Sequence, residues 1–236
     1  MLRGLREWLF GGNRLISIRT AESEKDLGAA YRFWYEIYVK EMGRHQDDVL
    51  TDHNNNLLYD RLASRGVLKL AEQNGRVVGT VLTTPAVDQH VSKYRKLYCI
   101  DESDKAQLTR SCITTKLMVA PEQRNTRLTL RLACATYDHG MRQGMLHNYI
   151  DCNDHLVSLF EKLGFERHLP TLYHPDYGKV NSMHLRVTDH IHLAQRRSPF
   201  LRLLLKFQEE QGLESAYLSA NNARTAQDNT EVNHGL

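Results

Sequence analysis

The chain has 236 residues, of which 41% are hydrophobic, and its 31 Lys and Arg against 28 Asp and Glu leave a net charge of +3. This length allows one large domain or two small ones, and the composition is typical of a globular protein. The weak charge, with no basic stripe carrying interleaved aromatics, argues against nucleic-acid binding, and no apolar run is long enough to span a membrane.

The first fifteen residues form an expected N-terminal amphipathic segment, 1–15, with Leu2, Leu5 and Leu9 at helical spacing and arginines between them. It is either a terminal helix packed on the domain or a weak membrane-surface contact. The segment lacks the long apolar core and cleavage site of a secretion signal, so we expect a cytoplasmic protein. The cysteines form no CxxC pair, which favours buried free thiols over disulfides.

An aromatic-rich helix is predicted to follow a first strand over 16–20. Ser23 and Asp26 have the spacing of a capping box, and apolar residues then recur at helical spacing as far as Gly43. Trp34 and Tyr38 lie in this stripe, as lining of an acyl pocket or as plain core. Glu41, near the end of the helix, is a candidate base.

Residues 45–56 read as a polar loop, with a short helix expected over 57–63. Asp52 makes this loop a candidate receiver of an amine, unless the loop is simply solvated. Two strands over 67–73 and 77–84 are joined by Asn74-Gly75, a strong hairpin signal. Glu72, at the end of the first of these strands, is a second candidate base. A long polar connection over 85–110, with one helix near 89–94, is expected to be functional or mobile.

The stretch from Ser111 to Phe165 is the most informative part of the chain. It predicts a strand, a turn with arginines, an amphipathic helix over 128–143, a short strand and a second helix ended by Gly164. A unit of this kind aims the backbone amides of the turn and the helix start at an anion. Two more strands are expected near 165–168 and 182–187, followed by a helix that begins at Ser198-Pro199.

This stretch resembles the thioester-binding half of the GCN5-related N-acyltransferase (GNAT) superfamily. The resemblance implies an α/β fold with a mixed central sheet, splayed between strands 4 and 5 and flanked by helices. The segments YRFWYEIYVKEM, GRVVGTVL, TKLMVAP and the late D-x-x-H-L…SPF resemble one branch, the N-acyl-amino-acid synthases related to acyl-homoserine-lactone autoinducer synthases. We expect one acyltransferase domain over 16–212 and a disordered polar tail over 213–236.

The resemblance also implies positions for the donor. In these folds the fourth strand, here 114–120, offers a backbone amide to the thioester oxygen, and Leu117, Met118 and Val119 match that place. The turn that holds coenzyme A reads Gln/Arg-x-x-Gly-x-Gly/Ala. The matching residues here are Gln123, Arg124, Asn125, Thr126, Arg127 and Leu128.

Both glycine positions of that turn are filled, by Thr126 and Leu128, which should hinder close wrapping of a pyrophosphate. Arg124, Arg127 and Arg131 supply cations that suit a phosphate or the acidic surface of an acyl carrier protein, if they are not merely solvated. The expected donor is therefore a carrier protein or acyl-CoA thioester.

Two further positions depart from related patterns. Phe160 stands where many GNAT members have a tyrosine that protonates the leaving thiolate, so the thiolate leaves unaided or another group serves. Lys116 replaces an arginine of the lactone synthases and can contact the acceptor carboxylate or the donor phosphate. Ile113 replaces their glutamate, which disfavours S-adenosylmethionine as acceptor.

The sequence thus predicts an N-acyltransferase that moves a long fatty acyl group directly to the amine of an amino acid or similar small acceptor. Met118, Glu72 and Lys116 are the candidate catalytic residues, and no permanently bound cofactor is expected. One alternative is an acetyltransferase that uses acetyl-CoA; another is a non-catalytic acyl-binding module. The 12 histidines match no metal-ligand spacing, so no metal site is expected.

Overall fold

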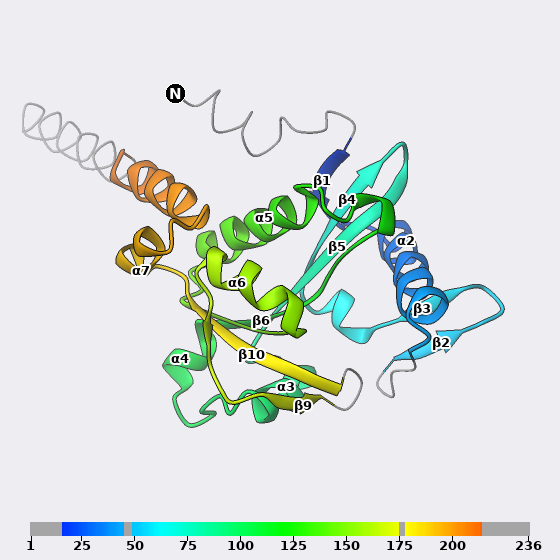
Figure 1. The fold of residues 1–236 in the computed structure, drawn as a ribbon, viewed down its shortest axis with the longest axis horizontal. Coiled ribbons are helices and arrows are strands. Elements are labelled where there is room, and N and C mark those ends of the chain that lie inside the picture. Colours follow the sequence, from blue (N-terminus) through cyan, green and yellow to red (C-terminus); the bar gives the residue numbers. More distant parts are fainter. Residues whose placement is uncertain (1–15, 45–48, 175–177, 214–236) are drawn as a thin grey trace, which may run out of the picture.

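A mixed sheet of eight strands forms the centre of the computed structural model, which describes residues 16–44, 49–174 and 178–213 (Figure 1). Its order is β1-β4-β5-β6-β7-β10-β8, with β9 paired to β10. The strands are β1 (Ile16–Thr20), β4 (Val67–Gln73), β5 (Arg76–Pro85), β6 (Ser111–Val119), β7 (His147–Cys152), β8 (Glu166–Arg167), β9 (Leu172–His174) and β10 (Gly178–Arg186). The β6–β7 pair is parallel and the other pairs are antiparallel. The expected α/β fold class is confirmed.

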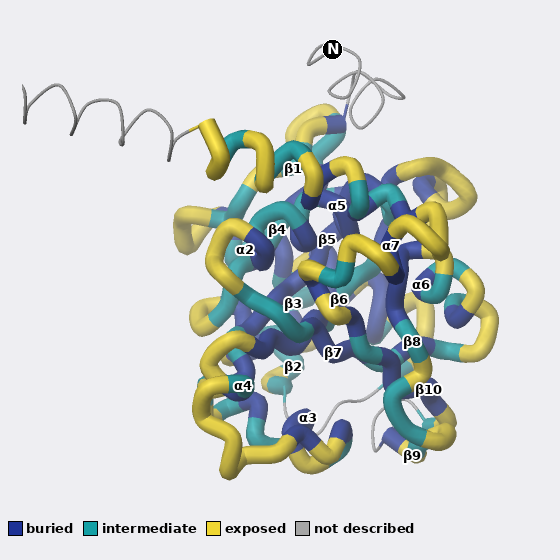
Figure 2. Tube along the Cα trace, turned by 90° about the vertical axis from the view of Figure 1, so that its left-hand side faces the viewer, coloured by how far each residue is buried: buried dark blue, intermediate teal, exposed yellow. Residues whose placement is uncertain are grey.

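The helices cover the two faces of this sheet. The backbone of Gly79 on β5 approaches Leu132 of α5 (Leu128–Arg142), whereas its neighbour Thr80 is hydrogen-bonded by Trp34 of α2 (Glu24–Trp34). Successive strand residues point to opposite faces, so α2 and α5 lie on opposite sides of the sheet. The strands between these layers are the most buried part of the chain (Figure 2).

Further helices extend both layers. Side chains of α6 (Val157–Leu163), α7 (His190–Gln195) and the helix over 200–213 share one core cluster with α5, β7 and β10. The α2 side carries α3 (Ser92–Leu97), preceded by a 3-10 turn (Gln89–Val91) and followed by α4 (Lys105–Thr109). No helix in the described ranges is long and apolar enough to cross a membrane. The segment 1–15 and residues 214–236 lie outside these ranges, so the expected domain limits stay predictions.

The helix α2 begins as the sequence predicted. The Ser23 hydroxyl accepts a hydrogen bond from the Asp26 amide, and the Asp26 carboxylate accepts one from the Ser23 amide, which completes the capping box. Beyond Trp34 the helix widens into a π-helix (Tyr35–Glu41), which the spacing did not predict. Gly43 then ends it with φ +61°.

The segment that follows is not the loop and helix that the sequence predicted. It forms a hairpin of β2 (Leu50–Asp52) and β3 (Leu57–Tyr59), followed by a 3-10 turn (Arg61–Ser64). The Asp52 carboxylate accepts the backbone amides of Asn54 and Asn55, and these bonds stabilise the turn between the strands. The predicted helix over 57–63 was therefore wrong.

The hairpin of β4 and β5 confirms the prediction from its turn, where Asn74 and Gly75 adopt φ +51° and +75°. The connection over 85–110 folds back on its own start at the buried Arg95, whose guanidinium donates to the carbonyls of Ala86 and Asp88 at 2.8 and 2.7 Å. Cys112, Cys134 and Cys152 are buried free thiols, as expected, and Cys99 is an exposed one.

The sheet splays between β6 and β7, the fourth and fifth strands of its acyltransferase unit. These strands pair only at Ser111–His147, Cys112–Asn148 and Ile113–Tyr149. Beyond Ile113, β6 continues alongside β5 and β7 continues alongside β10, so the backbones of β6 and β7 part, and we call this separation the opening. The predicted splay is confirmed.

Candidate active site

A β-bulge in β6 lies at this opening. Thr80 of β5 pairs with Met118, and Leu82 pairs with Thr115, so β6 has one residue more than β5 between these two pairs. Within this bulge the backbone of Lys116 has φ +54°, a left-handed conformation that a lysine adopts only when its surroundings impose it.

The surroundings of Lys116 form a buried box on the α2 side. Its ammonium lies 3.1 Å from Asp60 Oδ2, 4.7 Å from the ring centroid of Tyr38 and 5.6 Å from that of Trp34. The Lys116 side chain is 3% exposed and that of Asp60 is 9% exposed. This position under α2 argues against the expected contact of Lys116 with a donor phosphate. Trp34 and Tyr38 here pack on the ammonium.

A second contact sets the direction of the bulge backbone. Trp34 Nε1 donates to Thr80 Oγ1 at 2.9 Å, and Thr80 Oγ1 donates to the Lys116 carbonyl at 2.9 Å. In a trans peptide the carbonyl and the next amide point in opposite directions. The Leu117 N–H therefore points away from β5, toward the opening.

The pairing of β6 with β5 also gives the directions of the Met118 and Val119 amides. Ala120 N donates to Val78 O of β5 at 2.9 Å. Backbone groups alternate along a strand, so Met118 also directs its amide at β5, while Val119 and Leu117 direct theirs away. The structure thus argues against the Met118 amide as the donor to a thioester oxygen and favours Leu117 and Val119. Leu117 also packs against both core clusters, as a residue at the opening should.

The turn that leads to α5 is filled by its own side chains. Gln123 is buried and donates to Gln73 Oε1 at 3.0 Å. Thr126 Oγ1 donates to the Gln123 carbonyl at 2.7 Å and accepts the Leu128 amide at 3.1 Å, while Asn125 has φ +63°. The Thr126 hydroxyl therefore engages the first amide of α5, a group that could otherwise bind a phosphate.

The three arginines near this turn differ in their surroundings. Arg124 forms a two-point ion pair with Glu41, at 2.6 and 2.8 Å, which raises the pKa of Arg124. Arg131 is buried and donates to the Ile16 carbonyl at 2.8 Å, and burial lowers its pKa. Arg127 is exposed at the N-cap of α5 and forms no ion pair within the described ranges. Of the three, Arg127 is the cation best placed to meet a donor.

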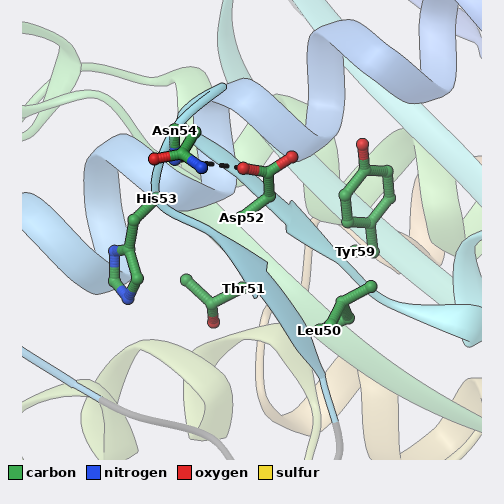
Figure 3. Close-up of a pocket in the computed structure, with 6 residues that line it drawn as sticks. All are labelled: Leu50, Thr51, Asp52, His53, Asn54 and Tyr59. Atoms are coloured by element: carbon green, nitrogen blue, oxygen red, sulfur yellow. Dashed lines mark hydrogen bonds between the residues drawn. The ribbon is translucent and has the colours of Figure 1, made fainter.

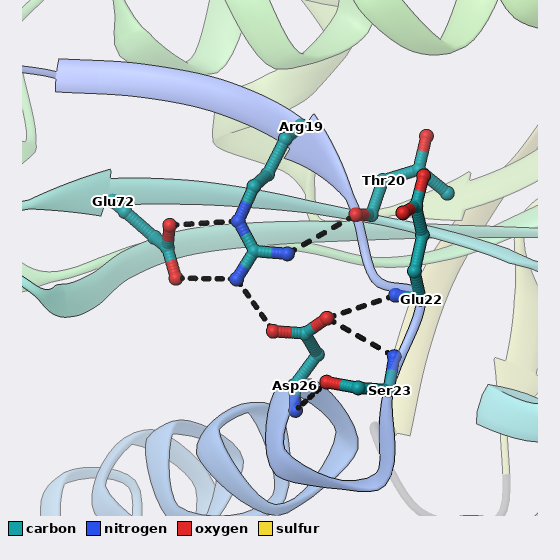
Figure 4. Close-up of polar contacts among 6 residues, drawn as sticks. All are labelled: Arg19, Thr20, Glu22, Ser23, Asp26 and Glu72. Carbon is teal, nitrogen blue, oxygen red and sulfur yellow. Dashed lines mark hydrogen bonds and ion pairs between the residues drawn. The ribbon is translucent and has the colours of Figure 1, made fainter.

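Glu72, one of the candidate bases, is held in a network on the outer strands (Figure 4). Its carboxylate accepts two hydrogen bonds from Arg19, both 2.8 Å long. Arg19 also bonds Asp26, and this contact, with the backbone bonds to the same carboxylate, holds the pKa of Asp26 well below its usual range. Both oxygens of the Glu72 carboxylate are thus occupied by Arg19, which argues against Glu72 as the catalytic base.

The carboxylates of Glu41 and Asp52 also have partners within the chain. Glu41 pairs with Arg124, and hydrogen bonds from Asn55 and Asn54 lower the pKa of Asp52. Asp52 does line an open surface hollow of about 630 Å³, shown in Figure 3 with its other lining residues Leu50, Thr51, His53, Asn54 and Tyr59. The hollow lies on the β2–β3 hairpin and not at the opening between β6 and β7.

Phe160 lies on α6 within the second core cluster and packs edge-to-face on Phe165, with ring centroids 5.5 Å apart. It carries no proton to donate, as its identity already implied. Sequence reasoning missed Asp60, Thr80 and Arg19, because each acts through a partner far away in the chain. No local pattern marks these pairs.

Comparisons with known proteins agree with this architecture. A family model described as N-acyl amino acid synthase FeeM matches residues 29–187, more than half of the chain. The structure is similar to the acyl-homoserine-lactone synthase LasI, with a TM-score of 0.61 at 13% identity, covering 78% of this chain and 95% of that one. It is also similar to FeeM from uncultured soil microbes, with a TM-score of 0.60 at 8% identity, covering 77% and 97%.

A third similar structure is MesI, described as a CoA-dependent acyl-homoserine-lactone synthase, with a TM-score of 0.58 at 19% identity over 77% of this chain and 93% of that one. At these identities the structural likenesses show the fold alone. No curated protein sequence matches the chain. The family match, together with an open sheet that carries a bulge in β6, identifies the chain as an acyltransferase that belongs to the FeeM family of N-acyl amino acid synthases.

Proposed function

We propose that this enzyme transfers a fatty acyl group from a carrier-protein or coenzyme A thioester to the amine of an amino acid or a similar small acceptor. One observation supports the proposal above all. The sheet opens directly after the Ile113–Tyr149 pair, and the hydrogen bond from Thr80 to the Lys116 carbonyl turns the Leu117 amide toward that opening. A thioester that lies in the opening meets a fixed hydrogen-bond donor.

The reaction then needs no covalent enzyme intermediate. The amine nitrogen attacks the thioester carbon, and the Leu117 amide stabilises the charge that develops on the thioester oxygen. The carbon–sulfur bond breaks, the thiolate leaves, and the amine gives its proton to a base. A thiolate is a good leaving group because thiols are far more acidic than alcohols, so the lack of an acid at Phe160 is tolerable.

The turn before α5 favours a carrier-protein donor over free coenzyme A. Thr126 occupies the first amide of α5, which removes one contact that a pyrophosphate could use. Arg127, exposed beside it, suits the single phosphate of a phosphopantetheine arm and the acidic surface around it.

The proposal is tested by incubating the full chain with a long-chain acyl carrier protein, the matching acyl-CoA or acetyl-CoA, together with a mixture of amino acids. Mass spectrometry then identifies any N-acylated product. We expect product from the long-chain donors, with the carrier protein preferred. Turnover of acetyl-CoA alone would favour an acetyltransferase, and acyl-chain binding without product in any mixture would favour a non-catalytic module.

Donor preference has a matched pair of variants. Arg127→Glu should raise KM for the acyl carrier protein about tenfold or more, because it places a negative charge against an acidic partner. Arg196→Glu makes the same change at an exposed arginine that follows α7 and should leave that KM unchanged. Equal effects of the two substitutions would show that only the net charge matters.

A further inference from the structure

The face of the opening that lies toward α3 is lined by polar side chains. Asp151 on β7 lies two residues beyond the last β6–β7 pair, and it is the cross-strand partner of Ser182 on β10. Tyr149 projects to the same face as Asp151. The ring of Tyr98, which follows α3, stacks on the ring of Tyr149, with centroids 6.5 Å apart. Asp151 and Ser182 therefore lie beside the opening, on the face opposite α6.

Besides the phenol of Tyr98, two hydroxyls beside the opening are buried without a hydrogen-bond partner among the described residues. Ser182 is fully buried, and its Oγ makes no hydrogen bond within the described part of the chain. The same is true of Thr115 Oγ1, which is buried two residues beyond Ile113 on β6. Thr115 lies on β6, at one edge of the opening, and Ser182 lies on β10, one strand beyond the other edge. A buried hydroxyl without a partner costs free energy, so the pair indicates a site that a polar guest completes.

The groups around Asp151 define the chemistry of that guest. Burial and the nearby Asp151 carboxylate raise the pKa of the Tyr98 hydroxyl, which is itself fully buried. His174, also buried, directs Nε2 at Asp151 Oδ2 from 4.0 Å. A carboxylate, an imidazole, a phenol and two hydroxyls are poor lining for an acyl chain, and together they suit an ammonium group or an amine.

The turn before α5, where we propose that the donor binds, lies on the other face of the sheet, because Gly79 faces α5 and Thr80 faces α2. An acceptor that enters from the α3 side would reach the thioester carbon from the face opposite the donor. This arrangement leaves both substrates their own route to the opening. It also places Asp151 near the nitrogen that attacks.

We propose that Tyr98, Thr115, Asp151, His174 and Ser182 form the acceptor chamber, which binds the acceptor's amino group, and that Asp151 takes up the proton. This inference rests on the proposed function and adds a named site and base to it. Asp151 first binds the ammonium form as its counter-ion. It then takes one proton from that ammonium, which leaves the neutral amine that attacks the thioester carbon. The second proton leaves the nitrogen as the carbon–nitrogen bond forms and the carbon–sulfur bond breaks, and the departing thiolate takes it up.

The unpartnered hydroxyls provide a test that a merely structural role would fail. Ser182→Ala and Thr115→Val should raise KM for the acceptor about tenfold each while the melting temperature stays the same or rises, because no internal hydrogen bond is lost. Ser111→Ala is the matched control. Its Oγ is equally buried but donates to the Gln107 carbonyl at 2.7 Å. This control should lower the melting temperature and leave the acceptor KM unchanged.

Asp151→Asn keeps the size of the side chain and removes its basicity. We expect kcat to fall about 100-fold or more, the usual contribution of a general base, while calorimetry shows unchanged binding of the acyl donor. Normal turnover in this variant, or unchanged acceptor KM in Ser182→Ala and Thr115→Val, overturns the chamber but not the proposed function. Absence of product from the unmodified chain with every donor and acceptor overturns both.

Discussion

Removing the ammonium of Lys116 should destabilise the protein strongly, because it leaves the Asp60 carboxylate buried and uncompensated. The two groups are 3.1 Å apart and nearly inaccessible to water. With an effective dielectric constant of about 20, their attraction is about 5 kcal/mol. Loss of one partner of a buried pair costs about 3–5 kcal/mol in proteins. We therefore expect Lys116→Met to lower the free energy of unfolding by about 3 kcal/mol or more.

A double-mutant cycle separates the pair from the packing around it. Asp60→Asn keeps the hydrogen bond that Asp60 Oδ1 accepts from the Leu62 amide at 2.8 Å, so its cost reports mainly the lost charge. The double variant should recover part of the combined loss, because it buries no unpaired charge. Urea unfolding, followed by the fluorescence of the buried Trp34, measures all four proteins.

Acyl-transfer activity is a second measurement on the Lys116 variants, because Lys116 lies in the bulge. Lys116→Arg keeps the cation and should retain more activity than Lys116→Met, since the direction of the Leu117 amide depends on the backbone of residue 116. A Lys116→Met protein that unfolds at the same urea concentration as the unmodified chain, and transfers acyl groups at the same rate, would refute the reasoning.

Three more outcomes follow from the described contacts. Glu72→Gln should lower kcat less than about tenfold in the acyl-transfer assay, because Glu72 is occupied by Arg19; a general base would lose about 100-fold or more. Asp26→Asn should destabilise by about 1 kcal/mol near neutral pH, because it removes the charge that pairs with Arg19 and weakens the acceptor of the Glu22 and Ser23 amides. The lowered pKa of Asp26 makes this difference greatest above the usual carboxyl range, and it should fade in unfolding titrations as the pH falls below that range. Gly164→Ala should lower the melting temperature, because φ is +107° there and a Cβ would come within 2.6 Å of Leu193.

The acyltransferase unit was predictable because its signals are local. The strand of β6, the start of α5, the Asn74-Gly75 turn and Gly164 all follow from short-range rules of spacing and turn chemistry. The hairpin of β2 and β3 was missed because Asp52 makes a turn that polar composition alone does not distinguish from a loop. Local signals also gave the position of β6, the strand that we propose meets the thioester.

The roles of individual side chains were less predictable, because ion pairs form between distant parts of the chain. Lys116 was singled out as a ligand contact, yet its partner Asp60 lies 56 residues earlier and marks no motif. Arg124 was assigned to the donor and Glu41 was a candidate base, yet the two side chains are bound to each other. Composition and spacing show how many charged side chains a chain has, but not which of them form ion pairs with one another.

The opening in the sheet is formed by contacts within the chain. Ile113 stays paired with β7, whereas three residues later Lys116 is drawn toward α2 by Asp60 and by the hydrogen bond from Thr80. The two ends of β6 are thus held to different neighbours, and the bulge takes up the difference. An amide that is fixed before the substrate arrives needs no reorganisation as charge develops on the thioester oxygen, and this is the condition under which such a donor is most effective. In the proposed reaction, the buried pair at Lys116 would therefore act on catalysis only through the backbone that it holds in place.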